Sequence, residues 1–339
     1  MKIIVDAFGG DHAPLAVIEG CRQAVDELGA EILLTGDEEK IRQAAAMAKI
    51  SLDGMEIVHA PSVIPVEEDP TTLLKKYADS SMAVGLRLLS EGKGEAFVSA
   101  GSTGALVVGS TLVVKRVKGV RRIAIGTLVP NAGSGYLLVD AGANHDCRPE
   151  MLLQFALMGS AYMEKVQGIQ KPRVGLLNIG AEPSKGDTLR HETYALLKEA
   201  GEAGRIHFIG NVEANTALLG GADVIVADGY SGNILLKGVE GCAKLMMGEL
   251  KKALRSSTKS KLGALLVKDS LRDMKKLLDP SEIGGTPFLG ISKPVLKAHG
   301  SSDAHAICNA VQRAIEYAQS GIIADVEAHI DEMKVEKQA

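Results

Sequence analysis

Residues 95–110 read EAFVSAGSTGALVVGS, and this stretch predicts one complete unit of an α/β fold. The apolar run that follows Glu95 is short and bounded by small residues, which is typical of a buried strand. The glycine-rich SAGSTG after it has the composition of a tight turn or of a loop that holds a ligand with its backbone. No charged residue then occurs until Lys115, so 103–117 is expected to be a closely packed helix.

The same unit recurs along most of the chain. Strand-length apolar runs occur at KIIVDAF (2–8), EILLTG (31–36), EIVHA (56–60), EAFVSAG (95–101), IAIGTLV (123–129), YLLVDAG (136–142), RVGLLNIG (173–180), IHFIGN (206–211) and DVIVADG (223–229). Helical patterns occupy 15–29, 37–48, 79–91, 103–117, 148–167, 187–201 and 231–254. This alternation predicts a mainly parallel sheet wrapped by helices, in which 123–129 and 136–142 are close enough to form a hairpin. After residue 240 the chain is expected to be nearly all helical.

The composition restricts the function. The chain has 339 residues, 46% of them hydrophobic, which is enough for a large core. Its net charge of −4 and its 3% aromatic content without Trp argue against nucleic acid as a partner. The four cysteines are far apart and the N-terminus lacks a signal-peptide pattern, so we expect a cytoplasmic protein with reduced thiols. No apolar run is long enough to cross a membrane.

Six polar, glycine-rich turns follow predicted strands. They lie at 6–14, 99–105, 140–146, 178–188, 210–215 and 228–233. Open parallel sheets bind ligands at the carboxyl ends of their strands, so the six turns are expected to meet at one edge of the sheet. Each turn alone is equally compatible with tight packing, and the prediction of a site rests on their number.

The turn SAGSTG fits the start of a helix, with Ser102 or Thr103 as the N-cap. Free backbone N–H groups at such a start attract anions, and Gly101 and Gly104 would let a phosphate come close to the backbone. The turn matches neither the ATP-binding loop nor the dinucleotide fingerprint, which favours a small anion. The alternative is that these residues only cap their helix.

Charged and amide side chains in the other turns are the candidates for chemistry. Lys185 in EPSKGD is the lysine embedded in a glycine turn, and it could neutralise an anion or be a solvated loop residue. Asn233 opens the helix at 231–254 and could donate its amide to a developing oxyanion or cap the helix. Asp228 and three other aspartates that end or follow strands (Asp6, Asp11 and Asp140) could orient cations or cap helices.

Several common catalytic patterns are absent from the sequence. There is no GxSxG, no HExxH and no metal spacing among the eight histidines. Cys147 could be a nucleophile, but no partner His is identifiable and a buried thiol is the simpler interpretation. We therefore expect chemistry without a protein nucleophile, a metal or a cofactor.

The segment 250–282 differs from the rest of the chain. Apolar residues at 267, 271, 274 and 278 follow a helical spacing and are surrounded by lysines and arginines, which predicts a projecting amphipathic helical segment. Leu262, Leu265, Leu266 and Val267 would form an apolar tip suited to an anionic membrane surface. The alternatives are packing on a dimer partner and binding of an acidic carrier protein through the same basic residues.

Long motifs of this chain resemble those of the bacterial phosphate acyltransferase (PlsX) family. The motifs are DAFGGDHAP, VSAGSTGAL, LVDAGANHDC, QFALMGSAY, PRVGLLNIGAEPSKGD, FIGNVEAN and ADVIVADGYSGNILLKGVEG, and the resemblance runs in order from residue 3 to about 317. The resemblance implies a three-layer α/β/α sandwich related to the isocitrate and isopropylmalate dehydrogenases and to phosphotransacetylase, with 1–339 as a single domain. It also implies transfer of a long-chain acyl group from acyl-acyl-carrier protein to inorganic phosphate, which yields acyl phosphate for phospholipid synthesis.

The resemblance further implies site residues and partners. Lys185 and Asn233 would be the catalytic pair, the lysine neutralising phosphate and the amide polarising the thioester carbonyl. The residues expected to contact substrate are Gly101, Ser102, Thr103, Gly104, Asn144 and Asp228. The family is homodimeric and peripherally associated with the inner face of the cell membrane, where a downstream membrane glycerol-3-phosphate acyltransferase is an expected partner.

The chain departs from the family pattern at a few positions and leaves other functions open. The departures are Phe8 for Met, Ala181 for Glu, Ile123 for Pro, and Asn215 with Thr216 for Arg-Asp. They leave Lys185 and Asn233 unaffected. The alternatives are a phosphotransacetylase-like enzyme acting on acyl-CoA, a dehydrogenase of the related fold that binds nicotinamide and a divalent metal, and a non-catalytic lipid-binding regulator.

Overall fold

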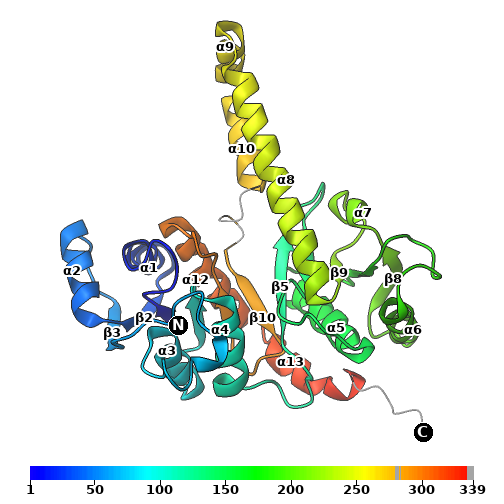
Figure 1. Ribbon diagram of the computed structural model, residues 1–339, viewed down its shortest axis with the longest axis horizontal. Coiled ribbons are helices and arrows are strands. Elements are labelled where there is room, and N and C mark those ends of the chain that lie inside the picture. Colours follow the sequence, from blue (N-terminus) through cyan, green and yellow to red (C-terminus); the bar gives the residue numbers. More distant parts are fainter. Residues whose placement is uncertain (279–281, 283, 334–339) are drawn as a thin grey trace.

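The structure is a computed structural model that describes residues 1–278, 282 and 284–333. A single eleven-stranded sheet runs through the described chain in the order β3-β2-β1-β4-β11-β10-β5-β6-β9-β7-β8, with helices on both faces (Figure 1). Seven of its ten strand pairings are parallel, since only β10–β11, β10–β5 and β5–β6 are antiparallel. The predicted mainly parallel α/β architecture is confirmed.

The first third of the chain builds one end of the sheet. Its strands are β1 (Lys2–Asp6), β2 (Glu31–Gly36), β3 (Met55–His59) and β4 (Ala96–Ser99). Its helices are α1 (Leu15–Leu28), α2 (Glu38–Ala48), the short 3-10 turn η1 (Pro70–Thr72), α3 (Ser81–Ser90) and α4 (Thr103–Gly109). The helix expected at 103–117 ends early, because a π-type turn, η2 (Ser110–Val114), follows α4 and Lys115 has a positive φ of 73°.

The middle third builds the other end of the sheet. Its strands are β6 (Tyr136–Val139), β7 (Arg173–Leu177), β8 (His207–Val212) and β9 (Val224–Val226). Its helices are α5 (Pro149–Lys165), α6 (Thr188–Glu202) and α7 (Ala214–Leu218). The nine strand-length runs predicted from the sequence all contain strands, and the predicted hairpin is β5 (Ala124–Val129) paired with β6.

Two strands that the sequence did not predict join these two ends. The chain was expected to be nearly all helical after residue 240, but β10 (Thr286–Leu289) and β11 (Val295–Lys297) lie at the centre of the sheet. Because β10 is antiparallel to both β11 and β5, and β5 is antiparallel to β6, the two parallel blocks point in opposite directions. The six glycine-rich turns therefore meet at two edges of the sheet, and the expectation of a single edge is wrong.

The core lies on both faces of the sheet, as the alternation of side chains in its strands requires. In β4, Ala96 and Val98 belong to one buried cluster and Phe97 to the other. The first cluster is covered by α1, α5, α12 (Ala304–Gln319) and α13 (Ile322–Ala328), followed by η3 (Ile330–Met333), and the second by α3 and α4. The result is three layers, as expected.

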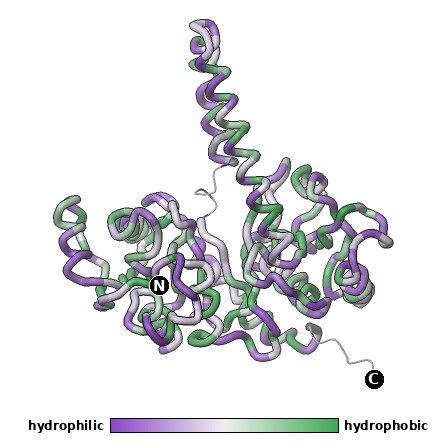
Figure 2. The backbone as a smooth tube through the Cα atoms, viewed as in Figure 1, coloured by the Kyte–Doolittle hydropathy of each residue, from purple (hydrophilic) through white to green (hydrophobic). Residues whose placement is uncertain are grey.

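A helical arm projects from this body. It consists of α8 (Gly229–Arg255), α9 (Thr258–Leu266) and α10 (Lys268–Leu278), with α9 at the far end (Figure 1). Hydrophilic and hydrophobic residues both occur along its length (Figure 2). The projecting helical segment expected from the sequence is present, and its amphipathic character stays a prediction. Residues 279–281 of the predicted 250–282 lie outside the described residues. Within the described chain, no helix is both long enough and apolar enough to cross a bilayer.

Candidate functional site

A cavity of about 650 Å³ lies between β5 and α8. Strand β5 contributes a floor that includes Ile125, Thr127 and Val129, and α8 contributes residues three or four positions apart, from Asn233 to Met247. The distance along β5 between Ile125 and Val129 is about 13 Å, at the usual rise of a strand. The cavity therefore connects the two edges at which the glycine-rich turns lie, and we call it the central cavity.

Both apolar and polar side chains line the central cavity. The apolar lining includes Ile125, Leu128, Val129, Pro130, Leu218, Leu236, Val239, Ala243 and Met247. The polar lining includes Thr103, Asn233, Lys237, Lys297 and His299. A site of this size and composition is typical for a ligand with a long apolar part and a polar or charged end.

Lys297, at the end of β11, contacts the SAGSTG turn. Its Nζ donates to the carbonyl oxygen of Ala100 at 3.2 Å and to that of Ala298. Burial lowers the pKa of Lys297 to about 8, although the nearby carboxylates of Asp6 and Asp11 oppose the shift. The side chain is thus a poorly solvated cation that an anionic ligand would stabilise.

The SAGSTG turn is fixed by a buried network. The Asp6 carboxylate accepts from Ser99 Oγ at 2.7 Å, and Ser99 Oγ accepts in turn from Gly101 N at 3.1 Å. Ser102 caps α4 by accepting from Ala105 N, so the capping interpretation holds for this residue. Gly104 packs on Pro70, because an added Cβ would lie 2.7 Å from the proline Cγ. Of the four predicted residues of the turn, Thr103 lines the central cavity.

The first turn of α8 places Asn233. Asp228 is buried and caps the helix by accepting from Ser231 N at 2.9 Å, so it holds the helix start. Gly232 lies so close to the loop after β6 that an added Cβ would be 2.0 Å from the Asp140 carbonyl oxygen. Asn233, the next residue, lines the central cavity beside Gly142.

Asn144 orders the loop after β6. Its Nδ2 donates to the Ile123 carbonyl at 2.7 Å and to Asp140 Oδ2 at 2.8 Å, so both amide hydrogens are used within the protein. Asp140 is buried and also accepts from the backbone N of Ile125 and Ala143. Burial raises the pKa of Asp140, although these hydrogen bonds oppose the rise. Asn144 does not line the central cavity.

Lys185 lies apart from the central cavity, on the exposed loop between β7 and α6. The loop is held by the side chain of Asn178, which donates to the Lys185 carbonyl at 3.0 Å. The end of the loop is connected to α8 through Arg190 of α6. Arg190 pairs with Asp187 at the end of the loop at 3.0 Å and with Asp228, the N-cap of α8. Lys185 and Asn233 therefore lie at the same edge of the sheet, without both lining the same cavity.

Other candidate groups have no visible role in chemistry. Burial raises the pKa of Cys147 to about 12, so its thiol is protonated at neutral pH and a poor nucleophile. Among the residues that the structure describes, no group of three or more His, Cys, Asp or Glu side chains is placed to hold a metal ion.

Lys297 is the functional candidate that the sequence did not reveal. It belongs to VLKAHGSSD, which is a further glycine- and serine-rich turn after a strand. Because the chain after residue 240 was expected to be helical, strand β11 was not predicted. Recognition of β11 would have added Lys297 to the candidates by the same argument that selected Lys185.

These features define a protein of the three-layer α/β class, with a cavity across its sheet that is lined by both apolar and polar side chains. The chain belongs to the family described as fatty acid synthesis protein, whose model matches residues 1–325. It is 43% identical to a phosphate acyltransferase of Clostridium acetobutylicum, over 98% of this chain and 100% of the relative. It is also 43% identical to a phosphate acyltransferase of Acetivibrio thermocellus, over 99% and 98% of the two chains.

Solved structures share the fold at low sequence identity. A phosphotransacetylase from Streptococcus pyogenes matches with a TM-score of 0.64 and 18% identity, over 94% of each chain. A 4-hydroxythreonine-4-phosphate dehydrogenase from Klebsiella pneumoniae matches with a TM-score of 0.55 and 13% identity, over 94% of this chain and 99% of the other. The expected relationship to the phosphotransacetylase and dehydrogenase folds is confirmed at the level of the fold.

Proposed function

We propose that this protein transfers a long-chain fatty acyl group from acyl-acyl-carrier protein to inorganic phosphate, yielding acyl phosphate for phospholipid synthesis. The carrier-bound donor follows from the family, and the relatives named phosphate acyltransferase support the transfer to phosphate. The observation that carries the proposal is the central cavity, which is lined by apolar side chains together with Thr103, Asn233 and Lys297. The apolar lining suits an acyl chain, and the polar lining suits a thioester and an anion.

The reaction needs little covalent help from the protein. A phosphate oxygen attacks the thioester carbonyl carbon, the new C–O bond forms, and the C–S bond then breaks to release the carrier thiolate. Because phosphate is itself the nucleophile and the thiolate is a fair leaving group, positioning the reactants provides most of the catalysis, worth up to about 7–11 kcal/mol. This requirement agrees with a site that has an amide and lysines but no activated nucleophile.

The residues divide this work between binding and charge stabilisation. Asn233 donates to the carbonyl oxygen as it becomes an oxyanion. Lys297 neutralises phosphate beside the SAGSTG turn, whose Gly101, Ser102, Thr103 and Gly104 contact phosphate or the carbonyl. Lys185, on the loop between β7 and α6, stabilises the negative charge that develops in the reaction at the edge of the sheet where Asn233 also lies.

The proposal includes the surroundings in which the protein works. It is a homodimer of single-domain chains in the cytoplasm that associates with the inner face of the cell membrane and passes acyl phosphate to a membrane glycerol-3-phosphate acyltransferase. The tip of the arm supports membrane contact, because Leu262, Leu265, Leu266 and Val267 are all exposed there, Leu266 to 82%. Leucines exposed at the end of a projection have no evident role in the folding of the body.

The test is a direct assay for the product. Purified protein is incubated with palmitoyl-acyl-carrier protein and radiolabelled phosphate, and label that enters an acyl product is measured. A parallel reaction with palmitoyl-CoA addresses the alternative donor. We expect label in the product with the carrier-bound donor, and lower rates for both Lys185→Ala and Asn233→Ala.

Three results would each contradict a part of the proposal: the activity, the donor, or the roles of Lys185 and Asn233. The absence of labelled product would exclude the transferase activity. A faster reaction with palmitoyl-CoA than with the carrier-bound donor would favour a phosphotransacetylase-like enzyme. Wild-type rates in both Lys185→Ala and Asn233→Ala would remove these residues from the reaction while leaving the activity itself.

A further inference from the structure

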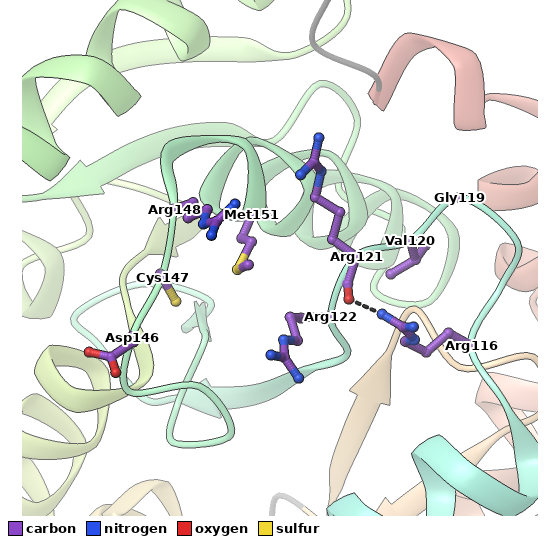
Figure 3. A pocket seen from close by; sticks show the side chains of 9 residues that line it. All are labelled: Arg116, Gly119, Val120, Arg121, Arg122, Asp146, Cys147, Arg148 and Met151. Atoms are coloured by element: carbon purple, nitrogen blue, oxygen red, sulfur yellow. Dashed lines mark hydrogen bonds between the residues drawn. The ribbon is translucent and has the colours of Figure 1, made fainter. Parts of the chain in front are cut away.

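A second large cavity lies outside the site described above. It has a volume of about 950 Å³ and is lined mainly by the loop before β5 and the segment that leads into α5 (Figure 3). Four arginines surround it, namely Arg116, Arg121, Arg122 and Arg148, and we call it the arginine cavity. In Figure 3, Arg122 and Arg148 approach the cavity from two different segments, with Met151 between them.

The charge around the arginine cavity is unusual for this chain. The segment KRVKGVRR at 115–122 has five basic residues and no acidic one, whereas the whole chain has a net charge of −4. All four arginines are exposed, and none forms an ion pair with an acidic side chain in the described part of the chain. Arg116 donates to the Arg121 carbonyl, and Asp146 is the acidic residue in the lining. Exposed guanidinium groups without an acidic partner around a hollow are typical of surfaces that bind carboxylates or phosphates of a partner.

The arginine cavity is next to the catalytic edge of the sheet. Arg122 precedes Ile123, whose carbonyl accepts from Asn144, and Cys147 on the other wall donates through Sγ to the Asn144 carbonyl at 3.5 Å. The same Asn144 carbonyl accepts from Gly229 N at 2.7 Å, in the first turn of α8. One loop therefore separates the arginines from Asn233.

The basic arm is a poorer place for a partner that must deliver a thioester. From Asn233 to Lys252 the helix rises about 28 Å, and the lysines of α9 are farther along the chain. The arm's charges are also partly neutralised, since Lys252 pairs with Glu249 and Arg272 with Asp269. Its exposed leucines suit lipid better than an acidic protein.

We infer that the arginine cavity is the docking surface for the acyl carrier protein, which places acidic side chains among the four arginines while its thioester reaches the central cavity. This inference rests on the proposed function. It assigns the two basic surfaces of the molecule to two partners, with the arginine cavity receiving the carrier protein and the arm receiving the membrane.

The test compares two charge reversals of equal size. Arg121→Glu/Arg122→Glu alters the arginine cavity, and Lys259→Glu/Lys261→Glu alters α9. The side chains of Arg121 and Arg122 make no hydrogen bond that the fold depends on, since Arg121 is held through its backbone N and carbonyl. Melting temperatures verify folding, and Arg122→Gln provides a milder variant in case the double reversal fails to fold.

Three quantities are measured for each variant. They are the KM for palmitoyl-acyl-carrier protein, the KM for phosphate, and the direct binding of fluorescently labelled carrier protein. For Arg121→Glu/Arg122→Glu we expect the carrier KM to rise by about tenfold or more, with weaker binding and less salt dependence, because the charges that attract the partner are reversed. The phosphate KM and the rate at saturating carrier should stay near wild type.

The outcomes separate this inference from the proposed function. An unchanged carrier KM and binding in the arginine variant, or a rise confined to Lys259→Glu/Lys261→Glu, would overturn the docking surface. A rise in the phosphate KM alone would show that the arginine cavity binds phosphate instead, which also overturns it. If wild-type protein binds the carrier through these arginines but makes no acyl phosphate, the docking surface stands and the proposed function fails.

Discussion

At the scale of single residues, Asn233 and Lys297 show how different groups are brought to one cavity. Asn233 comes from the start of a helix and Lys297 from the end of a strand, at opposite edges of the sheet. Asn233 offers a neutral donor, and Lys297 offers a cation whose pKa is lowered by burial. The two therefore respond differently to substitution and to pH.

Replacement of Asn233 should slow the chemical step. Asn233→Ala removes the donor proposed for the oxyanion, so kcat should fall by about 10²–10³-fold, the usual effect of losing one such donor. The matched control is Asn215→Ala, since Asn215 is an exposed amide that lies outside the central cavity. Initial rates of acyl phosphate formation measure the effect, and equal rates for the two variants would contradict the role of Asn233.

The charge of Lys297 should appear in the pH profile. Because its pKa is lowered to about 8, the side chain is an ammonium below that pH and becomes neutral above it. Binding of phosphate should therefore weaken in wild type as the pH rises through 8. The ratio of kcat/KM for phosphate in wild type to that in Lys297→Gln, measured from pH 6.5 to 9.5, should fall across this range. A constant ratio would exclude Lys297 as the cation.

At the scale of elements, α8 belongs to both the site and the arm. Its first turn is locked against the loop after β6, and its middle covers the central cavity before the helix leaves the body. A shift at the start of this helix would move Asn233 and the cavity wall together.

The glycines of α8 provide a test of this locking. Gly232→Ala places a Cβ against the Asp140 carbonyl, and overpacking against backbone should cost roughly 1–3 kcal/mol of the free energy of unfolding and reduce activity. Gly241→Ala is the control on the same helix, because no atom lies within 4 Å of its added Cβ, and it should stabilise by up to about 1 kcal/mol. Urea unfolding measures both, and equal stability changes would refute the locking.

At the scale of the whole molecule, the arm extends an apolar tip away from a body that holds the site (Figure 1). Because the tip is distant from the body, the proposed membrane contact and the proposed catalysis should be separable by substitution. If the tip binds lipid, its substitution should reduce membrane binding and leave the activity unchanged. If the tip is needed for folding, its substitution should reduce both.

The tip can be tested without disturbing the site. Leu265→Glu/Leu266→Glu should strongly reduce co-sedimentation with vesicles of phosphatidylglycerol and phosphatidylethanolamine, because two exposed leucines that would insert into the bilayer are replaced by charges that anionic lipid repels. Acyl phosphate formation in solution should remain near wild type. Met47→Glu, at a methionine 79% exposed on α2, is the control. Unchanged vesicle binding in the tip variant would exclude the tip as the contact.

The sequence predicted most of the fold because nine strands are apolar runs with clear turns after them. It failed at β10 and β11, because they are four and three residues long, and Pro287 and flanking glycines disguise them. The same failure hid Lys297 and the reversal of strand direction. Asn233 and Thr103 both line the central cavity, and each opens a helix after a strand; their roles as site residues stay predictions. The separation of Lys185 from that cavity depends on loop geometry, which composition does not determine.

The place of β10 and β11 in the sheet also sets an order of events during synthesis. These strands occupy the middle of the sheet but are translated after about five-sixths of the chain, at residues 286–297 of 339. Until they leave the ribosome, β4 and β5 have unpaired edges that invite wrong partners. Closure of the sheet is therefore expected to come late, through contacts distant in sequence that form slowly. A nascent chain stalled before residue 286 should depend on chaperones much more than one released after 300.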